Sequence, residues 1–173
     1  MKHHFTPFPV LHTQRLLLRP LTLLDEMEIF ELRSNDVVNR FLDRPKAQSL
    51  EDARRFIQKI IENVQLNEGI YWALAFQNDP RLIGGITLWN FDLKNDTAEM
   101  GYELLPQYQG QGLMQEALAK VIEYAFTTMQ LRSIVAASHI HNNGSLNLLK
   151  KNHFTLHPSQ EEPNMAIYVL TKT

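Results

Sequence analysis

Residues 107–112 (QYQGQG) place two glycines one residue apart between a strand-forming run and a run with helical periodicity. The strand-forming run covers residues 97–105, and the helical run begins at Leu113. A second strand-forming run, residues 133–140, follows that helix. A strand, a crossing helix and another strand form a right-handed parallel unit. The segment therefore predicts one parallel strand pair within the fold.

The rest of the chain predicts mainly antiparallel strands and three more helices. Thr22 and Ser49 each stand three residues before an acidic residue, which is a helix-capping pattern. The first predicted helix carries Leu23, Met27 and Phe30. The second carries an apolar stripe at spacings of three and four, made of Ala53, Phe56, Ile57, Ile60, Ile61 and Val64. The helix after the glycines carries the stripe Met114, Ala117, Leu118, Val121 and Ala125.

Further strands are expected at residues 13–19, 71–76, 82–89 and 165–171, and a short helix at residues 145–151. The predicted element order is β-α-α-β-β-β-α-β-α-β. It predicts an α/β (α+β) fold with a mixed, mostly antiparallel sheet, one parallel pair and flanking helices.

The composition favours one soluble globular domain over residues 1–173, with 44% hydrophobic and 21% charged residues. No apolar run reaches the roughly 20 residues that span a bilayer, and no secretory signal opens the chain. We therefore expect a cytoplasmic protein without a membrane partner. The absence of cysteine excludes disulfides, thiolate metal sites and cysteine nucleophiles. A net charge of −2 gives no basic face for nucleic acid.

The glycine segment favours an anion site over two nucleotide motifs. A dinucleotide fingerprint needs a third glycine where Gln115 stands, and the lysine of a phosphate loop is absent. A short loop before a helix N-terminus offers free N–H groups that suit a pyrophosphate. The alternative is that both glycines only serve a tight turn.

Three segments carry a resemblance to a known family. Gln107-x-x-Gly110-x-Gly112 resembles the Q/R-x-x-G-x-G/A segment of the GCN5-related N-acetyltransferases (GNAT). Residues 141–154 (HNNGSLNLLKKNHF) resemble the family's N-x-x-S/A…K-x-G-F stretch, with matches at Asn142, Ser145, Lys151 and Phe154. Residues 13–25 are similar to the start of the branch that acetylates N-termini of ribosomal proteins. The resemblance covers about residues 11–171.

The resemblance implies acetyl-CoA as cosubstrate, with no metal. Leu104 and Leu105 would offer main-chain groups to the thioester and pantetheine. The pyrophosphate would be surrounded by Gln109, Gly110, Gln111, Gly112, Leu113 and Met114. Asn142 and Asn147 complete the expected cofactor contacts. For Asn142, a helix cap is the alternative.

Acetyl transfer to an amine requires a neutral amine and a proton for the departing thiolate. A period of two puts Glu99 and Glu103 on one strand face, where their carboxylates could converge, and Glu99 is the predicted catalytic residue. Glu103, His139 and water remain open as routes for the amine proton. In one branch a glutamate on the strand after the helix is the base, but Ala137 holds that position here.

The remaining polar candidates have structural alternatives. Many family members use a tyrosine late in the short helix as the acid, and Leu149 replaces it here. Ser145 is therefore the predicted acid, with N-capping as its alternative. His139 is otherwise an ordinary half-buried strand histidine, and its pairing with His141 lacks a third metal ligand. His153 stands where the family usually has glycine.

These residues predict an acetyl-CoA-dependent N-acetyltransferase acting on a primary amine, first of all a protein N-terminal α-amine of the ribosomal-protein type. A small amine such as a polyamine, antibiotic or amino acid is the alternative acceptor. A non-catalytic acyl-CoA-binding module is the alternative outside enzymes, motivated by Leu149 and Ala137 at the two catalytic positions. Both a monomer and a homodimer are compatible with the sequence.

Overall fold

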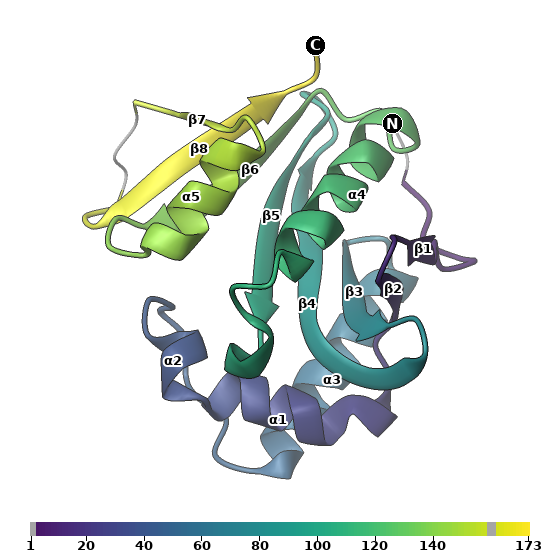
Figure 1. The fold of residues 1–173 in the computed structure, drawn as a ribbon. Coiled ribbons are helices and arrows are strands. Elements are labelled where there is room, and N and C mark those ends of the chain that lie inside the picture. Colours follow the sequence, from purple (N-terminus) through teal and green to yellow (C-terminus); the bar gives the residue numbers. More distant parts are fainter. Residues whose placement is uncertain (1–2, 159–161) are drawn as a thin grey trace.

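A computed structural model describes residues 3–158 and 162–173, which form one mixed sheet of eight strands with five α-helices (Figure 1). The strands are β1 (Leu11–His12), β2 (Leu16–Pro20), β3 (Gly69–Phe76), β4 (Asp79–Asp92), β5 (Thr97–Leu104), β6 (Ser133–His139), β7 (Thr155–Leu156) and β8 (Met165–Thr171). The helices are α1 (Glu26–Ser34), α2 (Asp36–Asn39), α3 (Leu50–Gln65), α4 (Leu113–Thr127) and α5 (Asn143–Lys151). Within these described ranges, no helix is long and apolar enough to cross a membrane.

The sheet confirms the predicted mixture of strand directions. Its order is β1-β2-β3-β4-β5-β6-β8-β7, and every neighbouring pair is antiparallel except β5 and β6. The parallel ladder has three residue pairs, of which Glu99 and Val135 form the last. Beyond that pair the two strands diverge, which Figure 1 shows as a gap between β5 and β6.

Helices cover both faces of the sheet and build two cores. The stripe of α4 is buried as predicted, with Ala117, Leu118 and Val121 inaccessible to solvent beside Trp72 of β3. On the opposite face, α1 and α3 bury Ile29, Leu32, Ala53 and Ile57. Ser49 caps α3 by accepting the Asp52 N–H at 3.2 Å, which confirms the predicted start of that helix.

The expected apolar face of the first helix is wrong. Leu23 and Met27 are 46% and 61% exposed, whereas Ile29 and Leu32 are buried. The reason is a 3-10 turn at Leu23–Asp25, which delays the start of α1 to Glu26 and changes the face that meets the sheet.

An ion pair holds this turn against β2. Asp25 is 4% exposed and accepts both terminal nitrogens of Arg19, at 2.7 and 3.0 Å. It also accepts the Thr22 N–H at 2.9 Å. The carboxylate therefore fixes where α1 begins, and α1 carries Arg33, which packs on Phe56, a residue that lines the cavity described below.

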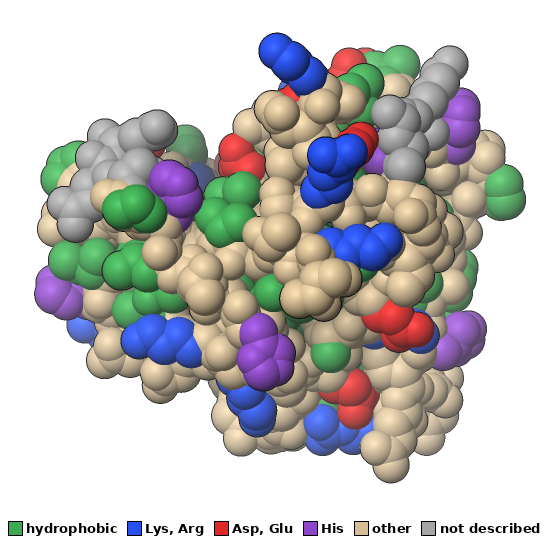
Figure 2. Space-filling view, turned by 90° about the horizontal axis from the view of Figure 1, so that it is seen from above, with side chains coloured by type: hydrophobic (Ala, Val, Ile, Leu, Met, Phe, Trp, Pro, Cys, Tyr) green, Lys and Arg blue, Asp and Glu red, His purple; other side chains and the backbone are tan. Residues whose placement is uncertain are grey.

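Charges of both signs are interspersed with apolar side chains on the face seen from above (Figure 2). Nucleic acid binding usually requires a continuous basic area. The described residues of this face show no such area.

Asp25→Ala should lower the free energy of unfolding by about 3 kcal/mol or more, because it leaves the Arg19 charge without its partner in a largely buried position. Urea titration measures the change. Asp79→Ala is the matched control, since the Asp79–Arg81 pair is exposed and should contribute less than about 1 kcal/mol. Equal losses for the two variants would contradict the structural role of Asp25.

Candidate active site

Beyond the last parallel pair, main-chain groups at the end of β5 face β6 without a partner on that strand. The Leu105 N–H donates to the Ile83 carbonyl of β4 at 2.9 Å. Because donor directions alternate in an antiparallel ladder, Leu104 directs its N–H and carbonyl toward the opposite edge, facing β6. The Gln109 side-chain amide donates to the Leu104 carbonyl at 2.9 Å. The Leu104 N–H is therefore a main-chain donor that faces the gap, while the Leu105 N–H is bonded to β4.

The glycine loop leads directly into α4. Gly110 and Gly112 both have φ of +75°, a conformation that side-chain-bearing residues rarely adopt, and Gly112 is the N-cap of α4. Leu113 and Met114 open the helix with their side chains in the core, 1% and 8% exposed. Only their main-chain N–H groups can serve an anion at the helix N-terminus. The exposed Gln111 bonds back to the Gln107 carbonyl at 3.0 Å.

Glu116, in the first turn of α4, anchors the end of this loop to the turn between β1 and β2. It accepts the Thr13 hydroxyl at 2.5 Å, the Arg15 N–H at 3.1 Å and the Arg15 Nε at 3.2 Å. Arg15 also donates to the Gln111 carbonyl at 3.1 Å. Burial raises the pKa of Glu116, but the bonds from Thr13 and Arg15 outweigh it and hold that pKa below its usual value.

The N-terminus of α5 lies across the gap from β5. Asn142 caps this helix by accepting the Ser145 N–H at 3.3 Å, so the cap is Asn142 and not Ser145. The Ser145 hydroxyl instead pairs with the Tyr102 hydroxyl of β5 at 2.6 Å. Asn147 is exposed on the same helix. The Ser145 hydroxyl is therefore not part of the helix cap, and Asn142 has a structural role as the N-cap residue.

Two hydroxyl groups at the gap were not found from the sequence. Tyr102 lies on β5, and burial raises its pKa above the ordinary value, although the bond to Ser145 opposes this. Ser138 lies on β6 beyond the last parallel pair and is 5% exposed. Its hydroxyl is buried without a hydrogen-bond partner among the described residues. Such an orphaned group is costly unless a ligand or water satisfies it.

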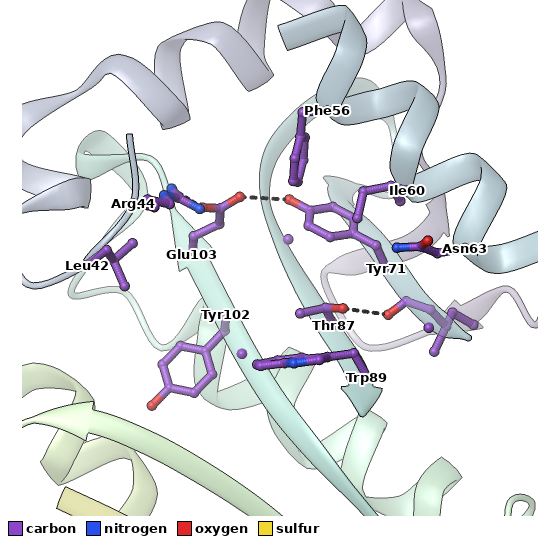
Figure 3. Close-up of a pocket in the computed structure, with 14 residues that line it drawn as sticks. Leu42, Arg44, Phe56, Ile60, Asn63, Tyr71, Thr87, Trp89, Tyr102 and Glu103 are labelled. Atoms are coloured by element: carbon purple, nitrogen blue, oxygen red, sulfur yellow. Dashed lines mark hydrogen bonds and ion pairs between the residues drawn. The ribbon is translucent and has the colours of Figure 1, made fainter. Parts of the chain in front are cut away.

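A cavity of about 350 Å³ lies on the α1 and α3 side of the sheet (Figure 3). Phe56 and Ile60 of α3 form one wall, and Thr87 and Trp89 of β4 lie opposite. Gly101 and Tyr102 of β5 line the cavity beside Trp89. The cavity and the Tyr102–Ser145 pair are therefore adjacent.

Glu103 is the acidic residue of the cavity wall, and both of its oxygens are engaged. One oxygen pairs with Arg44 at 2.7 Å, and the other accepts the Tyr71 hydroxyl at 3.1 Å (Figure 3). Tyr71 lies directly over Gly85, where any side chain would collide with the phenol. Burial, followed by the Glu103 charge, raises the pKa of Tyr71 well above its ordinary value. Glu103 is thus a structural acceptor rather than a free base.

Glu99 and Glu103 share a strand face but do not converge, contrary to expectation. They are four residues apart on one extended strand, which is about 13 Å. Gly101 lies between them and is covered by the indole of Trp89. Glu99 accepts the Asn90 amide at 2.6 Å and is not among the described residues that line the cavity.

His139 lies beside the rings of Phe41 and His141, at centroid distances of 5.1 and 5.4 Å. Its Nδ1 accepts the His141 N–H at 3.1 Å. Within residues 3–158 and 162–173, no group of three or more His, Asp or Glu side chains is placed to hold a metal ion.

Comparison with known proteins defines the class of this site. The acetyltransferase (GNAT) domain family matches residues 15–155 of the chain. The uncharacterized N-acetyltransferase YoaA of Bacillus subtilis is 35% identical over 144 residues, covering 83% of this chain and 81% of that protein. The chain therefore belongs to the GNAT family and is an N-acetyltransferase.

Other relatives include acetyltransferases of ribosomal proteins. The ribosomal-protein-serine acetyltransferase of Escherichia coli is 34% identical over 111 residues, covering 63% of this chain and 60% of that protein. The structure of the RimL ribosomal L7/L12 alpha-N-protein acetyltransferase with coenzyme A has a TM-score of 0.84 at 23% identity, covering 94% and 98% of the two chains. The microcin C7 self-immunity acetyltransferase MccE, solved with acetyl-CoA and AMP, has a TM-score of 0.80 at 20% identity, covering 92% and 93%.

Glu116→Gln should lower the free energy of unfolding at pH 7 by about 1–3 kcal/mol, because it weakens three hydrogen bonds to a charged group. It should also weaken acetyl-CoA binding in calorimetry, since the loop loses its anchor. The folded-state pKa of Glu116 is lowered, so its contribution is present above the unfolded pKa of about 4.3 and is lost as pH falls through the folded value.

The control is Glu123→Gln on the same helix, where Glu123 makes an exposed pair with Lys120. It should leave both quantities nearly unchanged. A stability difference between Glu116→Gln and the wild type that grows on acidification would contradict this account.

Proposed function

We propose that this N-acetyltransferase transfers the acetyl group of acetyl-CoA to the α-amine of a protein N-terminus. The observation that carries the proposal is the engagement of Glu103 by Arg44 and Tyr71. Among its described lining residues, the cavity offers no uncommitted carboxylate to a polyamine or an aminoglycoside, whose several ammonium groups need one. The names of the ribosomal-protein acetyltransferases among the relatives support the same acceptor class.

The free-energy cost of deprotonating the acceptor also favours an α-amine. An α-amine with a pKa of about 8 costs only about 1.4 kcal/mol to deprotonate at pH 7, whereas a lysine near 10.4 costs about 4.6 kcal/mol. A site without a free carboxylate base therefore suits an α-amine. We assign the amine proton to water, and Glu99 stays outside this route because it does not line the cavity.

The residues around the gap fit acetyl-CoA, which supplies an activated thioester when bound. The N–H groups of the glycine loop and the first turn of α4 would hold its pyrophosphate. The Leu104 N–H and the orphaned Ser138 hydroxyl would meet the pantetheine arm and thioester. Gln109 contributes indirectly, because its amide caps the Leu104 carbonyl.

The Tyr102–Ser145 pair supplies the proton for the departing thiolate. A thiol has a pKa of about 8.5 and an ordinary phenol about 10, and burial raises the pKa of Tyr102 further, so proton transfer from Tyr102 to a thiolate is uphill but far easier than from an aliphatic hydroxyl. An aliphatic hydroxyl alone is a much weaker acid. In this proposal Ser145 faces the thiolate and passes on the Tyr102 proton across their 2.6 Å hydrogen bond. The phenol thus takes over from the family tyrosine, whose position Leu149 occupies.

The acceptor class is tested by CoA release from acetyl-CoA with a panel of amines. Peptides that begin with Ser, Ala or Thr should react, and spermidine, lysine and an aminoglycoside should give less than about a tenth of that kcat/KM. Robust acetylation of spermidine or the aminoglycoside, with no peptide reacting, would overturn the proposal.

Ser145→Ala and Tyr102→Phe should each lower kcat by about 10²-fold or more, in the range typical of a lost general acid. The dissociation constant of acetyl-CoA should stay within about threefold. The double variant should lose little more than either single variant, because the two groups act as one unit.

Tyr124→Phe is the control, since Tyr124 is another tyrosine whose pKa is raised by burial, but it packs on Trp72 in the core. It should keep nearly full activity. Multiplicative losses in the double variant, or full activity of Tyr102→Phe, would remove Tyr102 from the proton route.

A further inference from the structure

Arg33 of α1 is a half-buried cation that lies behind the cavity-lining residue Phe56. Its guanidinium stacks on the ring of Phe56, 3.9 Å from the centroid, and Phe56 lines the cavity. In the described part of the chain, no carboxylate lies within ion-pair distance of it. Burial, followed by repulsion from Arg44, lowers the pKa of Arg33, although arginine remains charged at physiological pH.

Arg44 adds a second guanidinium nearby, and unlike Arg33 it lines the cavity directly. Its Nε donates to Asn39 at 2.8 Å, and one terminal nitrogen pairs with Glu103 at 2.7 Å. Its other terminal nitrogen makes no hydrogen bond with a described residue, and Arg44 itself lines the cavity. It can therefore bind a ligand anion without giving up Glu103.

The charges of Arg33, Arg44 and Glu103 do not cancel. Arg33 and Arg44 contribute two positive charges and Glu103 contributes one negative charge, so the sum is +1 in a chain whose net charge is −2. Asp36, which lies on α2 three residues after Arg33, forms an ion pair with Lys46. A buried or half-buried charge without a partner is unfavourable, and a planar guanidinium pair matches a carboxylate well.

We propose that Arg33 and Arg44 form an anion subsite of the acceptor cavity, which binds a carboxylate of the acceptor close to the reacting amine. This proposal rests on the proposed function, and within it the preferred acceptor is a protein N-terminus with Asp or Glu at the second or third position. A free amino acid offers the same chemistry through its α-carboxylate, and the two sources are separated by experiment.

The subsite also favours the neutral, reactive form of the acceptor amine. Two guanidinium groups near the acceptor disfavour an ammonium ion and favour the neutral amine that attacks a thioester. A carboxylate on the acceptor offsets the repulsion that a peptide N-terminus would otherwise meet. The two guanidinium groups therefore favour an acidic acceptor and disfavour a polycation.

The test compares two peptides that differ in one group, Ser-Glu and Ser-Gln starts on an otherwise neutral sequence. Binding to the CoA-loaded enzyme is measured by fluorescence anisotropy, and kcat/KM by CoA release. The wild type should favour the glutamate peptide by about tenfold or more in both measurements. In Arg33→Gln the ratio should fall to about one, and Arg33→Lys should keep part of it.

Arg81→Gln is the matched control, because Arg81 makes an exposed pair with Asp79 away from the cavity, and it should keep the wild-type ratio. The ratio compares two substrates on one preparation, so a smaller folded fraction in a variant cancels. A ratio near one in the wild type, an unchanged ratio in Arg33→Gln, or no measurable binding of either peptide would overturn the subsite for peptides.

Phenylalanine and phenethylamine form a second pair that differs in a carboxylate. If phenylalanine is preferred through Arg33 while no peptide reacts, the anion subsite stands and the proposed protein acceptor fails. If both peptides react equally well, the protein acceptor stands and the subsite fails.

Discussion

The early end of the parallel ladder between β5 and β6 is the constraint on which the site depends. After the Glu99–Val135 pair, β5 stays bonded to β4 alone as far as Leu104. Main-chain groups of β5, the Ser138 hydroxyl of β6 and the Tyr102–Ser145 pair consequently lie around one gap. The same crossover delivers Gly112 and the N-terminus of α4 to the gap. A fully paired sheet would have used the main-chain groups of β5 in its own hydrogen bonds.

The cavity on the α1 and α3 side of the sheet is built by interactions that keep charges in place. Asp25 holds the turn before α1 against Arg19, and α1 in turn carries Arg33 over Phe56. On the sheet, the absence of a side chain at Gly85 admits Tyr71, which bonds Glu103. Arg44 and Tyr71 thus hold the Glu103 carboxylate in a fixed position in the cavity wall, and Arg33 and Arg44 leave an excess of positive charge beside the cavity.

Periodic and conformational signals in the sequence predicted most of the fold and the conformation of the glycine loop before α4. The stripe of α4, the Ser49 cap and the glycines with positive φ are local properties. The elements β1, α2 and β7 span only two to four residues, too few for a pattern. Hydrogen bonds between residues far apart in sequence could not be predicted: Tyr102–Ser145, Tyr71–Glu103 and Arg44–Glu103 join residues 43, 32 and 59 positions apart.

A crystal structure of the chain with bound CoA tests the central claim most directly. The account predicts a pantetheine arm between β5 and β6 beyond the last parallel pair, with its amides near Leu104 and Ser138, and the pyrophosphate at the N–H groups of the loop that ends at Gly112. The thiol should then lie within hydrogen-bond reach of the Ser145 hydroxyl. CoA bound outside the gap, or a thiol remote from Ser145 and Tyr102, would contradict the account.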